Sequence, residues 1–530
     1  MKTPLFFNTA GPVNGDKHYC LPPLNRFNLE EILSLIEQEK YFVLHAPRQS
    51  GKTSSLKALM EYINREERYH CLYINVEMGQ AARENVKEGV QAILTELASR
   101  VRTSKWNDTF PQVKRREVLE EWGASAALNQ MLTLWAEKSP KPIVLLMDEI
   151  DSLVGDTLIS VLRQLRAGYD KRPALFPQSI ILCGVRDVRD YRIHSGQEKA
   201  IITGGSAFNV KAESLRLGNF TKADIQTLYT QHTQETGQRF EPETIDLAWE
   251  LTRGQPWLVN ALGYEVCFKI QAHRDRSVTI TTEMLEQAKE NLILRRETHL
   301  DQLMDKLKEA RVQRVIQPML LGENTPLAKE DTEYVVDLGL VHQNPNGHTE
   351  IANRIYQEVI PRELSWGFQM GIVQETAWYV DTTSGKLNID KLLAAFQSFF
   401  RENSEHWLQR FQYHEAGPQL LLQAFLQRIV NSGGRVEREY GLGRKRTDLL
   451  VIWPVSSGVQ KIVIELKLLR ISLQSTIADD LKQTWQYMDK AGTSLGHLLV
   501  FDRDPKRAWE KKIFSEPHTY KNQTIIVWGM

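Results

Sequence analysis

Short apolar runs alternate with longer amphipathic stretches over the first three hundred residues. The apolar runs occupy residues 41–45, 71–75, 143–147 and 179–183. Helical periodicity fills the stretches between them, as in residues 51–65 and 86–102. Strands that alternate with helices form parallel sheets with helical crossovers, and the uninterrupted run Ile-Val-Leu-Leu-Met at 143–147 is typical of a strand buried on both faces. The pattern predicts an α/β fold.

The pattern changes twice further along the chain. Residues 222–309 are mostly helical with a break at 253–256, and short helices then lead into a small hairpin, an order that is typical of a winged-helix module. A second α/β unit begins near residue 387. The predicted domains are a parallel-sheet core at 1–220, a helical lid at 221–305, a winged-helix module at 306–366 and a second α/β domain at 385–530.

Composition narrows the class of protein. The chain of 530 residues is long enough for two to four domains, and 42% hydrophobic with 25% charged residues is an ordinary globular composition. Lys+Arg and Asp+Glu both number 66, which argues against a globally basic nucleic-acid binder. Four scattered cysteines predict neither a disulfide framework nor a zinc site. Without a signal peptide or a long apolar stretch, we expect no membrane association and a cytoplasmic location.

Residues 46–53 carry the strongest motif. They read Ala-Pro-Arg-Gln-Ser-Gly-Lys-Thr and fit the P-loop pattern G-x-x-x-x-G-K-[ST], with Ala46 in place of the first glycine. We expect Lys52 to reach the β- and γ-phosphates of ATP and Thr53 to bind Mg²⁺. Because alanine is strained at positive φ, Ala46 puts the loop geometry in question. The predicted nucleotide-binding residues of this segment are Pro47, Arg48, Gln49, Ser50, Gly51, Lys52, Thr53 and Ser54.

The apolar run at 143–147 ends in Asp148-Glu149-Ile-Asp151, the pattern of a Walker B element. We expect Asp148 to hold the Mg²⁺ shell and Glu149 to orient or deprotonate the attacking water. Asp151 is either a helix N-cap or a partner of the metal ligands. An apolar strand that ends in two acids is common by itself, but downstream of a P-loop it strongly supports a nucleotide site.

The run at 179–183 leads into a polar cluster that begins with Arg186. In a parallel sheet this strand brings Arg186 near the γ-phosphate, where an arginine stabilises transition-state charge. A solvated charge cluster at the end of a strand is the alternative reading of the same residues.

These residues together resemble the signal-transducing and origin-recognition-like branch of the AAA+ ATPases. The resemblance rests on the segment 19–26 (Tyr-Cys-Leu-Pro-Pro-Leu-Asn-Arg), the P-loop, Asp148-Glu149, Arg186 and Gly254-Gln-Pro256, and it covers roughly residues 10–365. It implies that segment 19–26 lines the adenine pocket and that Pro256 contacts the base or its lid. It also supports the winged helix. The resemblance does not fix the number of subunits, so a homo-oligomer stays an open alternative.

The C-terminal domain contains a second group of chemically interesting residues. Two β-rich runs, 444–453 and 461–468, are joined by a short polar turn and predict a hairpin. Asp448 opens the first strand, and Glu465 and Lys467 share one face of the second. Two acids and a lysine fit phosphodiester hydrolysis, in which Asp448 and Glu465 hold Mg²⁺ and Lys467 activates or orients water. Glu465 and Lys467 are alternatively a surface pair on an edge strand.

This set resembles the PD-(D/E)XK nuclease superfamily, with Asp448 as the acid and Glu465-Leu-Lys467 as E-x-K. Gln483-Thr-Trp-Gln-Tyr487 matches the Q-x-x-x-Y motif of its recombination-exonuclease-like members, in which the glutamine and tyrosine support the site or touch DNA. The family takes a further acid from an upstream helix, here 414–430, and Glu415 at its start is the candidate. Glu415 is alternatively a first-turn acid favoured by the helix dipole, and Glu439, beyond this helix, is a rival for the role. The resemblance implies a restriction-endonuclease-like α/β domain, with Mn²⁺ as a substitute for Mg²⁺.

The combination of domains predicts an ATP-regulated nuclease that acts on nucleic acid, with DNA as the preferred expectation. The expected role is defence against foreign DNA or mobile-element processing. A nucleotide-dependent switch whose nuclease-like domain only binds nucleic acid or a protein is the alternative. A helicase is disfavoured because only the two Walker elements are present. Two basic clusters are candidates for following a nucleic-acid backbone, although such runs are often solvated faces: Arg435, Arg438, Arg444, Lys445 and Arg446, and Lys506, Arg507, Lys511 and Lys512.

Overall fold

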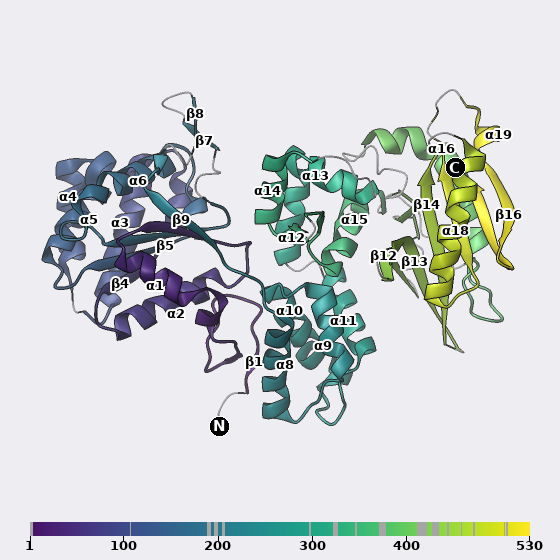
Figure 1. Ribbon diagram of the computed structural model, residues 1–530, viewed down its shortest axis with the longest axis horizontal. Helices are drawn as coiled ribbons and strands as arrows, with labels where there is room; N and C mark the ends of the chain where they lie inside the picture. The colour runs from purple at the N-terminus through teal and green to yellow at the C-terminus, as the bar shows by residue number, and fades with distance from the viewer. Residues whose placement is uncertain are drawn as a thin grey trace. The chain divides into compact units, whose positions relative to one another are not determined.

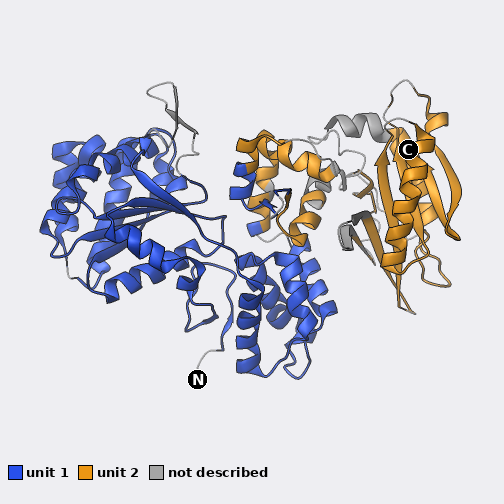
Figure 2. Cartoon of the chain, viewed as in Figure 1, with its two compact units in different colours: residues 1–299, 333–348 blue, residues 300–332, 349–530 orange. Residues whose placement is uncertain are grey.

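The computed structural model separates the chain into two compact units (Figure 2). Unit 1 consists of residues 1–299 and 333–348, and unit 2 of residues 300–332 and 349–530. The structure describes the chain except for residues 1–3, 107, 188–191, 196–199, 204–206, 296–297, 322–326, 345–346, 370–377, 411–420, 424, 427–433, 443–444, 457, 470–471, 503 and 505–506. It describes the backbone alone for residues 192–195, 200–203, 298, 304, 321, 362–369, 403–410, 435, 437–442 and 445–448.

A five-stranded parallel sheet forms the centre of unit 1, in the order β4-β5-β6-β3-β9 (Figure 1). Its strands are β3 (Tyr41–His45), β4 (His70–Asn75), β5 (Ile143–Asp148), β6 (Ser179–Gly184) and β9 (Lys211–Arg216). The four strands predicted from apolar runs are present within one residue of their expected limits, which confirms the α/β class. The pattern missed β9 because this edge strand is largely exposed and mostly polar.

Helices cover both faces of this sheet because alternate residues of each central strand point to opposite sides. On β5, Val144 and Leu146 pack with α1 and α2, whereas Leu145 and Met147 pack with α3 to α6 (Figure 1). The helices are α1 (Leu29–Glu37), α2 (Lys52–Arg65), α3 (Val86–Thr103), α4 (Phe110–Trp122), α5 (Ala124–Lys138) and α6 (Gly155–Ala167). The sheet is therefore a buried middle layer, with its strand ends left to form a site.

A helical region follows the sheet in unit 1, as predicted. It comprises α8 (Lys222–Thr236), α9 (Pro242–Thr252), α10 (Pro256–Tyr264) and α11 (Thr282–Leu294). The predicted break at 253–256 separates α9 from α10, where Arg253 and Gly254 have left-handed backbones. The short strands β1 (Phe6–Phe7) and β2 (His18–Tyr19) pair in parallel, and β1 packs on α10. β7 (Arg192–Ser195) and β8 (Ala200–Thr203) form a separate antiparallel pair.

Residues 298–369 have the order expected for a winged-helix module. The elements are α12 (Thr298–Asp305), α13 (Ala310–Leu321), α14 (Lys329–Asp337), β10 (Val341–Gln343), β11 (Thr349–Ile351) and α15 (Arg354–Gln369). The winged-helix assignment and the predicted domain limits stay predictions.

Unit 2 contains a six-stranded mixed sheet in the order β12-β13-β14-β15-β17-β16. The predicted hairpin is observed as the antiparallel pair β13–β14, and α18 then crosses over to β15, which is parallel to β14. α18 packs on one face of the sheet, and α16 places Phe396 and Phe400 near Phe501 of β15. The bounds are α16 (Ile389–Arg410), β12 (Arg435–Leu442), β13 (Lys445–Val455), β14 (Gly458–Leu468), α18 (Leu473–Ala491), β15 (Gly496–Phe501), α19 (Trp509–Lys512), β16 (Phe514–Tyr520) and β17 (Gln523–Gly529).

The four cysteines are free thiols, and Cys71, Cys183 and Cys267 are buried. Burial raises the pKa of the Cys183 thiol well above its ordinary value, so this residue serves as a small apolar core group. No helix in the described part of the chain is long and apolar enough to cross a membrane.

Candidate functional site

The P-loop connects the end of β3 to the start of α2. Gly51, the residue before α2, has φ +88°, a left-handed conformation that glycine adopts without steric cost. A Cβ at this position would lie 2.8 Å from Nη1 of Arg26. Gly51 therefore lets the chain turn sharply, so that the first N–H groups of α2 open toward the loop and can bind phosphate.

Ala46 does not strain this loop. The left-handed conformations of the segment belong to Gln49 and Gly51, and Ala46 is not among the residues with positive φ. Its side chain is fully buried, and its N–H donates to the carbonyl of Gly184 at 3.2 Å. The first residue of the loop is thus still hydrogen-bonded to the sheet, and alanine at this position does not strain the backbone of the loop.

Lys52 is buried and lies over the loop that precedes it. Its Nζ donates to the carbonyl oxygens of Ala46 and Pro47, both at 3.0 Å, while the hydroxyl of Ser50 donates to Pro47 O at 2.7 Å. A buried ammonium is stable only when acceptors surround it. The loop backbone supplies these acceptors and holds the lysine where phosphate would meet it.

Asp148 is fully buried at the end of β5 and accepts hydrogen bonds from two other elements. Thr53 of α2 donates to Oδ2 at 2.7 Å, and Tyr73 of β4 donates to the same atom at 2.9 Å. The N–H of Glu149 donates to Oδ1 at 3.0 Å. The two predicted metal ligands, Thr53 and Asp148, are therefore in direct contact. Tyr73 was not predicted, because alternation along β4 shows that it is buried but not what its hydroxyl reaches.

Glu149 follows Asp148 in a left-handed conformation, with φ 58°. Burial raises the pKa of its carboxyl group, and the nearby Lys52 opposes this shift. A partly desolvated carboxylate beside the phosphate loop suits a residue that orients or deprotonates water. Asp151 is not a helix N-cap: its Oδ1 accepts the N–H of Val185 at 3.3 Å and so ties the end of β5 to the end of β6.

Arg186 is not part of a solvated cluster, since its side chain is only 14% exposed. Its Nε lies 3.8 Å from Oδ2 of Asp337, and its guanidinium lies 4.7 Å from the ring centre of Tyr334. Nδ1 of His45, at the end of β3, lies 3.8 Å from the other oxygen of Asp337. Burial and the neighbouring Arg216 lower the pKa of His45 to about 4. The structure brings Arg186 to the strand ends beside the P-loop, where an acid from residues 333–348 contacts it.

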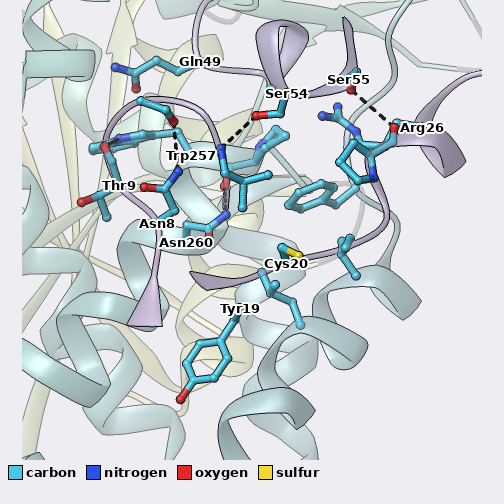
Figure 3. A pocket seen from close by; sticks show the side chains of 18 of the residues that line it. Asn8, Thr9, Tyr19, Cys20, Arg26, Gln49, Ser54, Ser55, Trp257 and Asn260 are labelled. Carbon is cyan, nitrogen blue, oxygen red and sulfur yellow. Dashed lines mark hydrogen bonds between the residues drawn. The ribbon is translucent and has the colours of Figure 1, made fainter. Parts of the chain in front are cut away.

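A cavity of about 150 Å³ opens beside the P-loop (Figure 3). Residues of segment 19–26, which the family resemblance expects at the adenine pocket, line this cavity together with Pro256 of α10 and the P-loop residues Gln49, Gly51 and Ser54. The N-terminal segment 8–13 also lines it, through residues 8–11 and 13, and sequence patterns did not indicate this segment. Val13 N–H donates to the Ser54 hydroxyl at 3.0 Å, and the Trp257 indole donates to Thr9 O at 2.9 Å. Residues 8–13 therefore connect α2 to α10 along one wall of the cavity.

Arg26 joins the P-loop to the segment that leads into α8. Its guanidinium donates to the carbonyls of Ser50 and Gly218 and lies 5.0 Å from the ring centre of Phe220. Burial lowers its pKa to about 10. The cavity is thus lined by a cation beside the phosphate loop and by aromatic side chains such as Phe220 and Trp257, a combination that suits the sugar and base of a nucleotide.

The second cluster lies in unit 2, on β14 and α18. Glu465 is 1% exposed, and its Oε1 accepts from Gln483 Nε2 at 2.8 Å and lies 2.9 Å from Lys467 Nζ. Gln483 also donates to the Tyr487 hydroxyl at 2.9 Å. β14 lies between β13 and β15 in the sheet, so Glu465 and Lys467 are not a surface pair on an edge strand.

The other predicted acids are only partly placed. Leu449 of β13 pairs with Ile464 of β14, and the antiparallel register continued by one residue sets the backbone of Asp448 beside that of Glu465. Glu415 lies outside the described residues, and Glu439 is described by its backbone in β12. No group of three His, Cys, Asp or Glu side chains that could hold a metal is found among the described residues.

Of the predicted basic clusters, the first and Lys506 lie outside the described side chains. Arg507 donates to Asp502 at 2.5 Å. Lys512 is 7% exposed, with its Nζ 5.1 Å from the ring centre of Trp509, so this residue is not a solvated contact for a nucleic-acid backbone.

Comparison with known proteins identifies the family to which the larger part of the chain belongs. The AAA-like domain family matches residues 24–360, which is more than half of the sequence. Similar solved structures include a Walker-type ATPase of Pyrococcus abyssi (18% identity, TM-score 0.40), Cdc6p of Pyrobaculum aerophilum (15%, 0.35) and the RuvB Holliday junction branch migration motor of Thermotoga maritima (13%, 0.32). Each match covers 63% of this chain, and 94%, 93% and 95% of the respective neighbours.

A search of curated proteins found no match. The P-loop, the Asp148 contacts and the parallel sheet all lie within the matched residues. The chain therefore belongs to the AAA-like domain family of P-loop ATPases, with its ATP-binding domain at residues 24–360.

Proposed function

We propose that this AAA-like ATPase is a nucleotide-controlled, metal-dependent nuclease that hydrolyses phosphodiester bonds in DNA, and that the Glu465 cluster is its cleavage site. The observation that carries the proposal is the burial of Glu465 in an interior strand, with Lys467 and Gln483 both directed at one of its oxygens. A buried carboxylate destabilises a fold unless donors or cations compensate it. Polar groups in such a place are more simply explained by chemistry than by stability.

The arrangement supports the PD-(D/E)XK assignment in three respects. Glu465 and Lys467 lie two residues apart on β14 and share a face of the sheet. The register sets Asp448 beside Glu465 on the neighbouring strand. α18 begins soon after β14, and of the predicted Q-x-x-x-Y pair Gln483 donates to Glu465 and also to the hydroxyl of Tyr487. Two of the three short motifs therefore meet at the Glu465 carboxylate, and the third lies beside it in the register of the backbone.

We propose a divalent cation at each of the two sites. In unit 2, Asp448 and Glu465 would hold Mg²⁺ or Mn²⁺, which supplies charge stabilisation to a phosphate under attack. In unit 1, Thr53 and Asp148 would hold the Mg²⁺ of ATP, since their side chains already meet. Lys52 binds the phosphates, Glu149 orients the water, and Arg186 stabilises the γ-phosphate once it leaves Asp337.

Plasmid cleavage tests the proposal directly. Linear and circular DNA are incubated with Mg²⁺ or Mn²⁺, with and without ATP, and the parent chain is compared with Glu465→Gln and Lys52→Ala. We expect cleavage by the parent, its loss in Glu465→Gln, and a changed ATP dependence in Lys52→Ala. The control for Glu465→Gln is Glu516→Gln on β16, because the Glu516 side chain is 65% exposed. The control for Lys52→Ala is Lys87→Ala on α3, because Lys87 is exposed.

Two outcomes would count against cleavage. Equal cutting by the parent and Glu465→Gln would indicate a contaminating nuclease. No cutting under any condition, with ATP hydrolysis and DNA binding in EDTA both intact, would instead establish a nucleotide-dependent switch whose C-terminal domain only binds nucleic acid.

A further inference from the structure

Asp480 of α18 belongs to the same cluster, although no sequence motif includes it. Its Oδ1 lies 3.6 Å from Lys467 Nζ, and its side chain is 17% exposed compared with 25% for Lys467. Asp480 precedes Gln483 by three residues and Tyr487 by seven, and these spacings put all three on one face of the helix. This face of α18 lies against the end of β14 that carries Glu465 and Lys467.

The contacts between α18 and β14 form two matched pairs. Gln483 bonds to Glu465, and Asp480 lies next to Lys467, so both Glu465 and Lys467 have a partner on the helix. The orientation of α18 on β14 is fixed by apolar packing, because Val463 of β14 lies in the same core cluster as Ile477 and Met488 of α18. The Asp480–Lys467 pair is thus held by a packed helix–strand contact.

The pair matters most when Glu465 binds a metal ion. A divalent cation held by Glu465 would repel the Lys467 ammonium and weaken the 2.9 Å contact between Lys467 and Glu465. Lysine carries its charge on a flexible four-carbon stem, so the ammonium then has many alternative positions. Asp480, one helical turn from Gln483, offers a negative charge on the side of Lys467 that faces the helix.

We propose that Asp480 is a positioning residue, which keeps the Lys467 ammonium at the reaction centre while Glu465 holds the metal. This inference rests on the proposed nuclease function. Asp480 acts through Lys467 and contacts neither the DNA nor the metal. The alternative is that Asp480 only fastens α18 to the sheet, and this role would affect stability without depending on Lys467.

A double-mutant cycle on DNA cleavage separates these roles. We expect Asp480→Asn to lower kcat about 10- to 100-fold, the range for residues that orient catalytic groups, with little change in KM for DNA. Asp480→Glu should restore part of the rate because it keeps the charge. In a Lys467→Ala background, adding Asp480→Asn should change kcat by less than about twofold. The control is Asp479→Asn, the same substitution at the exposed neighbouring position.

The inference is overturned if Asp480→Asn leaves kcat unchanged, or if its full effect persists without Lys467. A second measurement applies even if the parent cuts no DNA, in which case the proposed function fails separately. Acylation of Lys467 with Mg²⁺ present is measured by peptide mass spectrometry against the exposed Lys482 as reference. Asp480→Asn should raise the relative rate about two- to fivefold, as expected for loss of a partly exposed ion pair, whereas an unchanged rate contradicts the positioning role.

Discussion

The nucleotide site of unit 1 and the Glu465 cluster of unit 2 each place a lysine near an acid, but they hold it by different means. Lys52 donates to the main-chain carbonyls of Ala46 and Pro47, which lie within six residues of it. Lys467 lies between the carboxylates of Glu465 and Asp480, which come from a strand and a helix. The first site is built largely from backbone and the second almost entirely from side chains.

This difference affects how each site tolerates substitution. Every residue has a carbonyl, so the P-loop accepts alanine for glycine at Ala46 as long as the backbone keeps its path. In the Glu465 cluster each hydrogen bond requires a particular side chain at a particular register. We therefore expect substitutions to act through backbone conformation in unit 1 and through individual charges in unit 2.

The largest expected effect tests the part of the nucleotide site that does depend on a side chain. Glu149→Gln removes a carboxylate that can orient or deprotonate water, so ATP hydrolysis should fall about 10²- to 10⁴-fold. ATP affinity should change little, because the backbone-built phosphate loop is untouched. Phosphate release and binding of a fluorescent nucleotide measure the two effects, with the exposed Glu77→Gln as control. Lost binding in Glu149→Gln would show that this side chain also builds the loop.

Acid should destabilise both units through buried histidines, among them His299 in unit 1 and His497 in unit 2. Burial lowers the pKa of His299 in unit 1 and of His497 in unit 2 to about 4. In the unfolded chain, each of these histidines binds a proton near pH 6.5, whereas in the folded chain it stays neutral. The free energy of unfolding therefore has its full value above pH 6.5 and decreases as the pH falls toward 4. The loss should reach up to about 3 kcal/mol per histidine.

Urea unfolding followed by tryptophan fluorescence at several pH values measures this loss. His497→Gln and His299→Gln should each flatten the pH dependence of one unit alone. A midpoint that does not change between pH 6.5 and 4 would contradict the prediction.

Gly51→Ala tests the backbone-built site at its most constrained residue. The left-handed φ of +88° and the 2.8 Å approach to Arg26 Nη1 should together cost about 1–3 kcal/mol and weaken ATP binding. Gly237→Ala is a matched control outside the cavity: its φ is +80°, but no atom lies within 4 Å of the added Cβ. Calorimetric titration with ATP compares the two variants. Equal affinity in both would mean that the loop adapts and that its backbone is not the determining element.

The smallest effect concerns Tyr73, which together with Thr53 supports the Walker acid Asp148. Tyr73→Phe removes the 2.9 Å hydrogen bond to Asp148, and a bond to a charged group is worth about 1.5–3 kcal/mol. Because Thr53 and the Glu149 N–H still contact Asp148, we expect the lower end of this range in the free energy of unfolding. Denaturant titration of the parent and the variant measures it. A larger loss would show that the nucleotide site depends on side chains as strongly as the Glu465 cluster does.

Sequence patterns predicted the contiguous features well. The P-loop, the Walker B strand and the four apolar strands depend on residues close together in the chain, and local spacing fixes their geometry. Asp151 was left open between two roles, because a hydrogen bond to Val185, 34 residues later, cannot be read from the local sequence. Lys512 was grouped with exposed cations, although packing with Trp509 buries it.

The sequence by itself determined the AAA-like nucleotide-binding domain, because a phosphate loop needs only a strand, a turn with glycine at the left-handed position and a helix in immediate succession. Tertiary structure alone decided that residues 8–13 line the cavity through contacts such as Trp257 with Thr9, that Tyr73 supports Asp148, and that Asp480 meets Lys467. These partners are separated by up to 248 residues, and their meeting depends on how whole helices and strands pack. Local patterns show that a side chain is buried, but only packing sets which atom it reaches.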